Sequence, residues 1–511
     1  MSGSQVTERY LQDIVPFLQL DECWKKIIVT GLAVDSRRVK AGNCFLGYPG
    51  HHSDGRDFLS SALVAGAGSA LVEAEGFERH SGVAANASVP VVAIPGLKKH
   101  LGHIASEFYG NPSTQLKLLA ITGTNGKTSV SQLTAQALDQ LGVCCGVVGT
   151  LGNGIVGHLE PTLNTTPDVV ECNRLLAEMR AAGADAATME VSSHGLVQGR
   201  VDGVTIHSGL ITNISRDHLD YHGTMEAYAQ AKAQLALHPG LRHLVLNWDD
   251  ERVAAMVSAR QEGTRLWSFS MQNRDDVTVR VLSVHYDKQG IDLTVGYGPQ
   301  HTSIRSPLIG EFNAANLVAC ITLLLTLDVD LEQAAAALST LGPVEGRMQR
   351  VEAEASQPMV IIDFAHTPDA LEKVLLTLKR HAGGRIWCVF GCGGDRDAGK
   401  RPLMAGVVAD LADELVITAD NPRSETFVGI VADMVKGIPA AVAFQVMEDR
   451  TQAVAYAIAH AQANDVVLIA GKGHENYQEI AGNKHPYSDL AAAQAALNAA
   501  VAVGAPDGED R

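Results

Sequence analysis

The chain has 511 residues, of which 46% are hydrophobic and 19% charged, and its formal net charge is −17. This length predicts roughly three domains, each able to bury a core. The acidic balance argues against a nucleic-acid-binding protein, which needs a basic face; a local field of opposite sign still allows anionic small substrates.

The first ten residues are polar and lack the apolar core of a signal peptide. No apolar run in the sequence is long enough to span a bilayer. The eight cysteines are scattered, and none has the paired spacing of metal ligands. We therefore expect a cytoplasmic protein of a reducing compartment, with no membrane insertion and no nucleic-acid partner.

Residues 1–111 predict a small α/β domain that ends at Asn111-Pro112-Ser113. We expect a strand, a helix and a second strand, at residues 44–46, 58–65 and 70–72. Polar residues that could hydrogen-bond a polar ligand lie at the ends of predicted strands: Ser36, His51, His52 and Ser53. On chemistry alone, solvated loops explain the same residues equally well.

The stretch Gly123-Thr124-Asn125-Gly126-Lys127-Thr128-Ser129 lies between an apolar strand and a helix with apolar residues at helical spacing. This context predicts a phosphate site, because loop N–H groups and the positive end of the helix dipole surround an anion. Lys127 suits the distal phosphates, and the Thr128 hydroxyl suits Mg²⁺. The general P-loop pattern has glycine where this chain has Ile121, so the loop is a shortened variant. The alternative is a tight glycine turn with a surface lysine.

Strands and helices alternate from residue 112 to 342, which predicts a mostly parallel sheet covered by helices. Ligands gather at the C-terminal ends of such strands. Three polar clusters follow predicted strands, at residues 164–167, 190–200 and 213–223. Residues 264–308 alternate as in β-hairpins and predict an antiparallel insertion or sheet edge.

Several side chains of residues 112–342 are candidates for a functional role. Glu190 ends a buried strand, where a carboxylate can bind the metal of a nucleotide. His218 follows the next strand and is either a metal ligand or a structural histidine. Lys232 lies in a helical stretch, and its spacing alone predicts a solvated lysine. Asn313 and Asn316 either cap the apolar helix that follows or reach a ligand, with capping as the simpler interpretation.

Residues 343–511 predict a doubly wound domain of the Rossmann type, after a boundary at Gly342-Pro343. Four apolar strands are followed by polar turns, which begin near Asp363, Gly391, Asp420 and Gly471. Solvated loops do not easily explain four such strand ends in one domain. The acidic segment after Gly504 is expected to be frayed.

Together these motifs resemble the Mur ligases and folylpolyglutamate synthases, whose phosphate loop also lacks the first glycine. Further matches run through the whole chain: Asp35-Ser36-Arg37, Gly50-His51-His52, Asn164-Thr165-Thr166, Met189-Glu190-Val191-Ser192-Ser193-His194, Asp217-His218-Leu219-Asp220-Tyr221-His222, Asp363-Phe364-Ala365-His366-Thr367-Pro368 and Gly471-Lys472-Gly473-His474-Glu475. Asp420-Asn421-Pro422-Arg423 is similar to the motif of the branch that adds meso-2,6-diaminopimelate. His52-Ser53 departs from the commoner glutamine-alanine pair of the family.

The resemblance implies three α/β domains: a uridine-nucleotide domain (1–111), a central P-loop ATPase-like domain with a parallel sheet (112–342) and a Rossmann-like amino-acid domain (343–511). It implies a monomeric, ATP-dependent amide ligase of peptidoglycan precursor synthesis. The terminal carboxylate of UDP-N-acetylmuramoyl-L-alanyl-D-glutamate would take the γ-phosphoryl group. An amine of meso-2,6-diaminopimelate would then attack the acyl phosphate, with release of ADP and phosphate.

The resemblance also assigns site residues. The catalytic residues it implies are Lys127, Glu190, His218 and Lys232. The Mg²⁺ ligands are Thr128, Glu190, His218 and Lys232, the last as a carbamate formed with CO₂, since a lysine amine is no ligand for this cation.

Three ligand sets complete the assignment. ATP would contact Gly123, Thr124, Asn125, Gly126, Lys127, Thr128, Ser129, Asn313, Arg347 and Asp363. The UDP-muramyl dipeptide would contact Val34, Ser36, His51, His52, Ser53, Asn164, Thr165, Thr166, Ser192, Gln198 and Arg200. Diaminopimelate would contact Arg396, Asp420, Asn421, Pro422, Arg423, Gly471 and Glu475. An arginine fork suits its distal carboxylate, and Asp420 or Glu475 suits an ammonium.

Two rival hypotheses stay open at this point. Another ligase of the same fold, a folylpolyglutamate synthase or a lysine-adding enzyme, is disfavoured by residues 420–423 and by the uridine-type N-terminal domain. A P-loop switch without ligase chemistry would need no amine pocket. The polar strand ends of the C-terminal domain therefore count against it.

Overall fold

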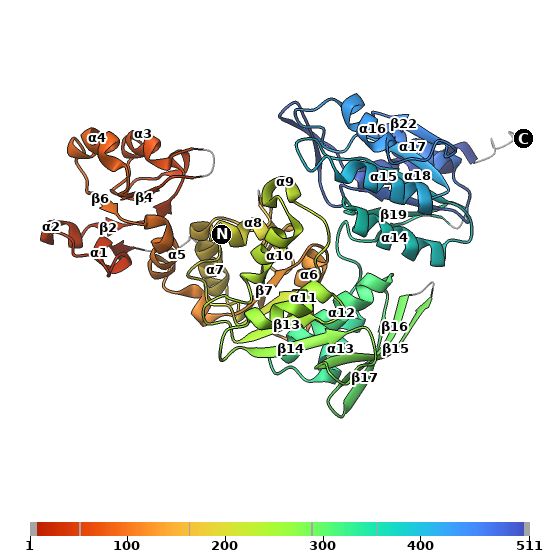
Figure 1. Cartoon of the computed structure of the whole chain (residues 1–511), viewed down its shortest axis with the longest axis horizontal. Coiled ribbons are helices and arrows are strands. Elements are labelled where there is room, and N and C mark those ends of the chain that lie inside the picture. The colour runs from red at the N-terminus through yellow and green to blue at the C-terminus, as the bar shows by residue number, and fades with distance from the viewer. Residues whose placement is uncertain (1–7, 51–52, 163, 288–289, 355, 505–511) are drawn as a thin grey trace, which may run out of the picture. The chain divides into compact units, whose positions relative to one another are not determined.

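The structure is a computed structural model that describes residues 8–50, 53–162, 164–287, 290–354 and 356–504 (Figure 1). Two compact units divide the chain. The first comprises residues 1–120, 142–209 and 237–242, and the second comprises residues 121–141, 210–236 and 243–511. The boundaries predicted at residues 111/112 and 342/343 stay a prediction. Among the described helices, none combines the length and apolar character needed to cross a membrane.

The N-terminal part of the first unit contains a four-stranded parallel sheet in the order β3-β4-β5-β6. Its elements are β1 (Arg9–Tyr10), α1 (Leu11–Ile14), α2 (Glu22–Lys25), β2 (Ile28–Val29), β3 (Leu32–Ala33), β4 (Cys44–Gly47), α3 (Leu59–Val64), β5 (Ser69–Glu73), α4 (Ser81–Ala85), β6 (Val91–Ile94) and α5 (Leu97–Phe108). The strands and helix predicted for this part are confirmed.

Helices cover both faces of this sheet, which is why β4 is apolar throughout. Successive residues of a strand point to opposite faces. Leu46 accordingly joins a core with Leu101 of α5, whereas Phe45 joins a separate core with Leu59 of α3.

The rest of the first unit contains a second group of strands. Its elements are β8 (Cys145–Gly149), β9 (Gly152–Ile155), β10 (His158–Glu160), α7 (Val169–Ala181), β11 (Ala186–Glu190) and α8 (Ser193–Val197). β11 runs parallel to β8, and the hairpin of β9 and β10 continues antiparallel from β8. β7 (Lys117–Thr122) and β12 (Ser208–Ile211) each have residues in both units.

The second unit begins with the helix that follows β7. Its first elements are α6 (Lys127–Gln140), α9 (Leu219–His222), α10 (Met225–Ala233), β13 (His243–Asn247), α11 (Glu251–Ala254), β14 (Arg265–Ser270), β15 (Val279–Asp287), β16 (Gly290–Tyr297), β17 (Gln300–Ser306), α12 (Glu311–Leu325) and α13 (Leu331–Ser339). The antiparallel prediction for residues 264–308 is only partly right. β14 pairs in parallel with β13 and β15, and the antiparallel ladder starts between β15 and β16.

The C-terminal part of the second unit is a doubly wound sheet in the order β18-β19-β23-β20-β21-β22. Its elements are β18 (Gln349–Val351), β19 (Met359–Asp363), α14 (Pro368–His381), β20 (Ile386–Phe390), α15 (Lys400–Leu411), β21 (Glu414–Thr418), α16 (Phe427–Val435), β22 (Phe444–Met447), α17 (Arg450–His460), β23 (Val466–Ala470), β24 (Tyr477–Ile480), β25 (Asn483–Pro486) and α18 (Asp489–Gly504). Only β18 pairs antiparallel within the sheet.

Two cores lie on the two faces of this sheet. One contains residues of α14, α15 and α16, and the other contains residues of α17 and α18. The four strands predicted from apolar runs are confirmed as β19, β20, β21 and β23. Sequence reasoning missed β22, a short strand at the sheet edge that is partly exposed, and the hairpin of β24 and β25, whose residues are mostly polar. The segment after Gly504, predicted to be frayed, lies outside the described residues.

Candidate active site

The phosphate loop connects β7 to α6 in the predicted strand–loop–helix order. Gly123 and Gly126 have φ angles of +145° and +87°, and a Cβ atom on Gly123 would lie 1.9 Å from Thr212 Oγ1. Glycine is therefore required at this turn. Gly126 is the N-cap of α6 and supplies no side chain, so the helix N-terminus is built to receive an anion.

Hydrogen bonds from neighbouring segments hold the loop in place. Asn125 N donates to Asn213 Oδ1 at 3.0 Å, and Thr212 Oγ1 donates to the Asn125 carbonyl at 2.7 Å. Lys127 Nζ donates to the carbonyl oxygens of Gly123 and Thr124 at 2.9 and 2.8 Å. The lysine thus folds over its own loop, and Thr128 and Ser129 lie buried in the first turn of α6.

Lys232 is buried, which makes the solvated interpretation drawn from its spacing wrong. Its Nζ donates to the Gly123 carbonyl at 2.7 Å and lies 4.5 Å from the ring centre of Tyr228, one helical turn earlier in α10. Burial, together with the charge of Lys127, lowers the pKa of Lys232 well below its usual value, although Asp217 acts in the opposite direction. A lowered pKa favours the neutral form of the amine, which is the form that can react with CO₂.

His218 lies next to this lysine's helix, at the N-cap of α9, with φ at +52°. Its Nε2 is 3.4 Å from Asp217 Oδ2, and Lys400 Nζ is 3.6 Å from the other oxygen of the same carboxylate. Burial alone would raise the pKa of Asp217, but the nearby positive groups, His218 and Lys400 foremost, lower it. Asp217 is therefore a buried charged carboxylate that orients His218.

Two further residues predicted to bind ATP, Arg347 and Asp363, lie in the same unit as the phosphate loop. Arg347 donates to Thr128 Oγ1 at 3.1 Å and stacks on the Phe364 ring at 4.4 Å. Asp363 accepts backbone hydrogen bonds from Met348 and Ala365 at 2.7 and 2.8 Å, and burial raises its pKa against the effect of Arg347. The structure thus brings Arg347 to the phosphate loop.

Asn313 lies in the first turn of α12, where capping was the simpler interpretation. That interpretation is wrong, because the N-cap is Gly310 and no side chain caps the helix. Asn313 Nδ2 instead donates to the Ile309 carbonyl at 2.9 Å, and Asn316 Nδ2 donates to Asn313 Oδ1 at 3.1 Å. The two asparagines form a buried pair.

In the first unit, Glu190 ends β11 with a fully buried side chain. Thr150 N donates to its Oε1 at 2.8 Å, and Thr150 Oγ1 donates to its Oε2 at 3.2 Å. Thr150 Oγ1 also lies 3.0 Å from Thr165 Oγ1. A buried carboxylate held in this way offers hard oxygen donors, the type that Mg²⁺ prefers.

Four residues predicted for the muramyl dipeptide lie together around this strand end. Thr166 Oγ1 donates to the Glu190 carbonyl at 2.9 Å and to Ser192 Oγ at 3.1 Å. Arg200 donates to Gln198 Oε1 at 2.9 and 2.7 Å and to the Thr166 carbonyl at 2.6 Å. Asn164 lies exposed two residues before Thr166.

The residues predicted for the uridine nucleotide lie in the N-terminal part of this unit. Val34 packs against the core of α5, and Ser36 begins a short 3₁₀ helix (Ser36–Arg38). Ser53 is exposed, and its carbonyl accepts from Gly50 N at 2.9 Å. His51 and His52 lie outside the described residues.

The residues predicted for diaminopimelate lie at the C-terminal ends of β20, β21 and β23. Asn421 Nδ2 donates to Glu475 Oε2 at 2.9 Å, and Lys472 Nζ contacts Asn421, Glu475 and Asp420 at 3.0, 2.8 and 3.5 Å. Gly471, with φ at +112°, donates its N–H to the Asp363 carbonyl at 3.0 Å. The structure thus joins the two loops into one charged cluster.

Arg423 lies at the edge of that cluster in a left-handed conformation, with φ at +54°. Its Nη1 donates to the Gly394 carbonyl at 2.8 Å, and its Nε is 3.3 Å from Glu479 Oε2 on β24. Arg396 donates to the Asp395 carbonyl at 3.2 Å, and the Pro422 carbonyl accepts from Glu425 N at 3.1 Å.

Sequence reasoning gave no role to four residues that complete these clusters: Thr150, Asp217, Tyr228 and Lys472. Tyr228 could have been found from its spacing of four residues from Lys232 on one helix. Lys472, between two glycines after a buried strand, could also have been singled out. Thr150 and Asp217 depend on tertiary contacts that no local pattern reports.

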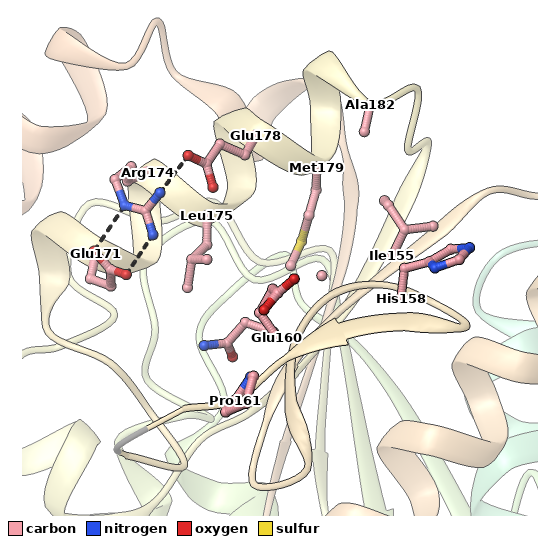
Figure 2. A pocket seen from close by; sticks show the side chains of 12 residues that line it. Ile155, His158, Glu160, Pro161, Glu171, Arg174, Leu175, Glu178, Met179 and Ala182 are labelled. Atoms are coloured by element: carbon pink, nitrogen blue, oxygen red, sulfur yellow. Dashed lines mark hydrogen bonds and ion pairs between the residues drawn. The ribbon is translucent and has the colours of Figure 1, made fainter. Parts of the chain in front are cut away.

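A cavity of about 390 Å³ lies elsewhere in the first unit, between α7 and the hairpin of β9 and β10. Figure 2 shows Arg174 bridging Glu171 and Glu178 on α7, with Met179 on the same helix and Glu160 on the hairpin side. None of the predicted site residues lines it. The chemistry above therefore belongs to the strand ends and not to this cavity.

Comparison with known proteins identifies the class. The Mur ligase middle domain matches residues 121–324, the Mur ligase glutamate ligase domain matches residues 346–473, and the catalytic domain of the Mur ligase family matches residues 28–109. The chain belongs to the Mur ligase family. The resemblance inferred from the motifs is confirmed.

Individual relatives identify the type of ligase within this family. A Pseudomonas aeruginosa protein is 47% identical over 476 residues, covering 93% of this chain and 96% of the relative, and a Chromobacterium violaceum protein is 48% identical over 471 residues, covering 91% and 93%. Both are named UDP-N-acetylmuramoyl-L-alanyl-D-glutamate–2,6-diaminopimelate ligase. The chain is a ligase of the same type as these relatives.

Solved structures agree on the fold. One with the same ligase name is 35% identical, has a TM-score of 0.68 and covers 96% of this chain and 99% of its own. The MurF ligase from Thermotoga maritima in complex with ADP has a TM-score of 0.63 at 16% identity, covering 93% and 98%. The predicted α/β Mur ligase fold is therefore confirmed.

Proposed function

We propose that this ligase joins meso-2,6-diaminopimelate to UDP-N-acetylmuramoyl-L-alanyl-D-glutamate at the expense of ATP, as a step of peptidoglycan precursor synthesis. The names of the relatives support this substrate pair. The observation that carries the proposal is that one compact unit contains both a phosphate loop and a cluster of Asp420, Asn421, Glu475 and Arg423. Carboxylates and a guanidinium in one cluster are complementary to ammonium and carboxylate groups, both of which diaminopimelate carries.

The first step transfers the γ-phosphoryl group to the terminal carboxylate of the dipeptide. An O–P bond to the carboxylate forms, the bond between the β- and γ-phosphates breaks, and ADP leaves. Two anions must approach in line, so their repulsion has to be offset by fixed positive groups. Lys127 supplies one, after its Nζ exchanges the loop carbonyls it now contacts for phosphate oxygens.

The second unit contains residues whose chemistry fits Mg²⁺. Thr128 would supply a hydroxyl, His218 a ring nitrogen, and a carbamate on Lys232 carboxylate-like oxygens. In the first unit, Glu190 offers a carboxylate that would suit the same cation. Bound Mg²⁺ supplies charge neutralisation for the two anions. The burial and the lowered pKa of Lys232 support the carbamate, because both favour the neutral amine, the form that reacts with CO₂.

The second step uses the C-terminal cluster. The amine nitrogen forms a bond to the acyl carbon, the bond to the phosphate oxygen breaks, and a proton leaves the amine. Arg423 binds the distal carboxylate in this proposal. Lysine lacks that carboxylate and would leave the guanidinium without its substrate partner, so diaminopimelate is preferred.

The first unit receives the nucleotide-linked substrate in this proposal. The cluster of Thr166, Ser192, Gln198 and Arg200 offers hydroxyl, amide and guanidinium groups to the peptide and muramyl part. The uridine part meets Val34, Ser36 and the loop that ends at Ser53. We place the enzyme in the cytoplasm as a monomer with domain boundaries at 111/112 and 342/343. Light scattering of the purified protein tests the monomeric state, and limited proteolysis tests the domain boundaries.

The decisive experiment measures phosphate release from ATP by the purified enzyme. Release is expected only when the UDP-muramyl dipeptide and diaminopimelate are both present, with lysine a much poorer amine. Turnover that is equally fast without any amine would instead support a P-loop switch. Equal use of lysine and diaminopimelate would remove the assigned specificity.

A further inference from the structure

The loop after β23 places a lysine where the proposed function expects a substrate ammonium. Lys472 is fully buried. Its Nζ lies 2.8 Å from Glu475 Oε2, 3.0 Å from Asn421 Oδ1 and 3.5 Å from Asp420 Oδ1. A buried charge requires such partners. The cluster assigned to the amine substrate therefore already contains one ammonium group of its own.

The cluster carries one more negative charge than positive charge. Asp420 and Glu475 contribute two carboxylates, and Lys472 contributes one ammonium. Burial would raise the pKa of Asp420, but Lys472 and further positive groups lower it, so the carboxylate is charged. The cluster is thus built to bind a single additional cation.

Other charged groups near Asp420 have partners of their own. Arg450 forms a buried ion pair with Asp489 at 2.8 Å, and Arg423 lies 3.3 Å from Glu479. His366 is buried, and burial lowers its pKa, which favours its neutral form. Lys472 is the cation that contacts both Asp420 and Glu475.

Hydrogen bonds also fix the orientation of these groups. Asn421 Oδ1 accepts from Lys472 Nζ and from Glu479 N at 2.9 Å, which sets the direction of the amide. Asn421 Nδ2 then donates to Glu475 Oε2, the same oxygen that Lys472 contacts. With Oε2 occupied twice, Oε1 is the oxygen of Glu475 left to receive a ligand.

We propose that Lys472 is a positioning residue that cancels one of the two carboxylates, so that the pocket binds one ammonium of diaminopimelate and leaves the other amine free to lose its proton. This deepens the proposed function and rests on it. A pocket with two uncompensated carboxylates would hold both amines protonated. A protonated amine has no electron pair with which to form the bond to the acyl carbon. The released proton passes to water, and phosphate leaves with the electrons of the broken C–O bond.

The test compares Lys472→Met with wild type in steady-state kinetics over pH. The KM for diaminopimelate is expected to rise about tenfold or more, because Asn421 and Glu475 lose the charged hydrogen-bond donor that orients them. The acidic limb of kcat/KM should move to higher pH by about one unit, because the uncompensated carboxylates keep the attacking amine protonated. The KM for ATP should stay within about twofold.

Matched variants separate charge from packing. Lys484→Met is the control, because Lys484 is exposed and its Nζ lies 4.0 Å from the same Tyr477 ring that Lys472 approaches at 5.6 Å. It should match wild type. The double variant Lys472→Met with Glu475→Gln restores the net charge and should return the acidic limb to its wild-type position, even though KM stays raised.

A second measurement uses the wild-type enzyme. Calorimetric titration of diaminopimelate in buffers of different ionisation enthalpy should show release of about one proton on binding at neutral pH. An unmoved acidic limb in a folded Lys472→Met enzyme, or no proton release by wild type, would overturn the proposal. A failure of the proposed function would look different from a failure of this inference. In that case, wild type itself would show no phosphate release that depends on diaminopimelate.

Discussion

Two buried lysines of the second unit, Lys232 and Lys472, have opposite surroundings. Lys232 contacts a carbonyl oxygen and an aromatic ring, whereas Lys472 contacts an amide and two carboxylates. Burial without a carboxylate contact disfavours the charged form of an amine, and carboxylate partners favour it. In the proposed function, the same residue type is therefore a modifiable amine at the phosphate loop and a cation in the amino-acid pocket.

The largest effect is expected from a substitution of Lys232, the first lysine of this comparison. Lys232→Met should lower kcat by about 10²–10³-fold, the size of effect seen when one group that stabilises transition-state charge is lost. Carbon-13 NMR of enzyme equilibrated with labelled CO₂ should show a carbamate resonance in wild type and in Lys472→Met, and none in Lys232→Met. A resonance that survives Lys232→Met would move the modification to another amine.

The next effect concerns the amino-acid pocket alone. Arg423→Met should raise the KM for diaminopimelate by about 10–100-fold, because a hydrogen-bonded charge pair contributes roughly 1.5–3 kcal/mol. Its KM for lysine should change much less. Competition assays with both amines measure the ratio, and an equal rise for ATP would place Arg423 outside the amine pocket.

A smaller effect concerns stability beside Lys472. Burial, with the charges of Arg347 and Lys472, lowers the pKa of His474 to about 3. Between the ordinary histidine pKa and this value the unfolded chain binds the proton and the folded chain does not. Folding stability should therefore fall with falling pH in this window, by up to about 1.4 kcal/mol per pH unit from this group.

His474→Gln should remove that contribution. Denaturant unfolding of both proteins at pH 7, 6, 5 and 4 measures the difference. Relative to the variant, wild type should lose stability as the pH falls towards 4, and parallel curves would contradict the pKa shift.

The smallest effect concerns Glu190, the carboxylate of the first unit that is proposed to bind Mg²⁺. Thr150→Val removes the hydroxyl that donates to Glu190 Oε2 at 3.2 Å and keeps the backbone donor. Loss of one such bond costs about 0.5–1.5 kcal/mol, so the Mg²⁺ concentration for half-maximal activity should rise about 2–10-fold. Thr162→Val, which alters an exposed loop hydroxyl, serves as the control.

Much of the fold followed from local patterns. Apolar runs of strand length predicted β7, β11, β19 and β23, and the glycine loop before α6 predicted the phosphate site with its open helix N-terminus. Such features depend on the period of a strand or helix and on the φ angles that glycine allows, which neighbouring residues set by themselves.

Tertiary structure decided what surrounds each charge. Spacing presented Lys232 as a surface lysine and gave Lys472 no role, yet both are buried. Their partners come from segments far away in sequence, Gly123 for one and Asn421 for the other. Whether a buried amine is neutral or charged depends on the dielectric and the partners around it, and only the folded chain brings those together.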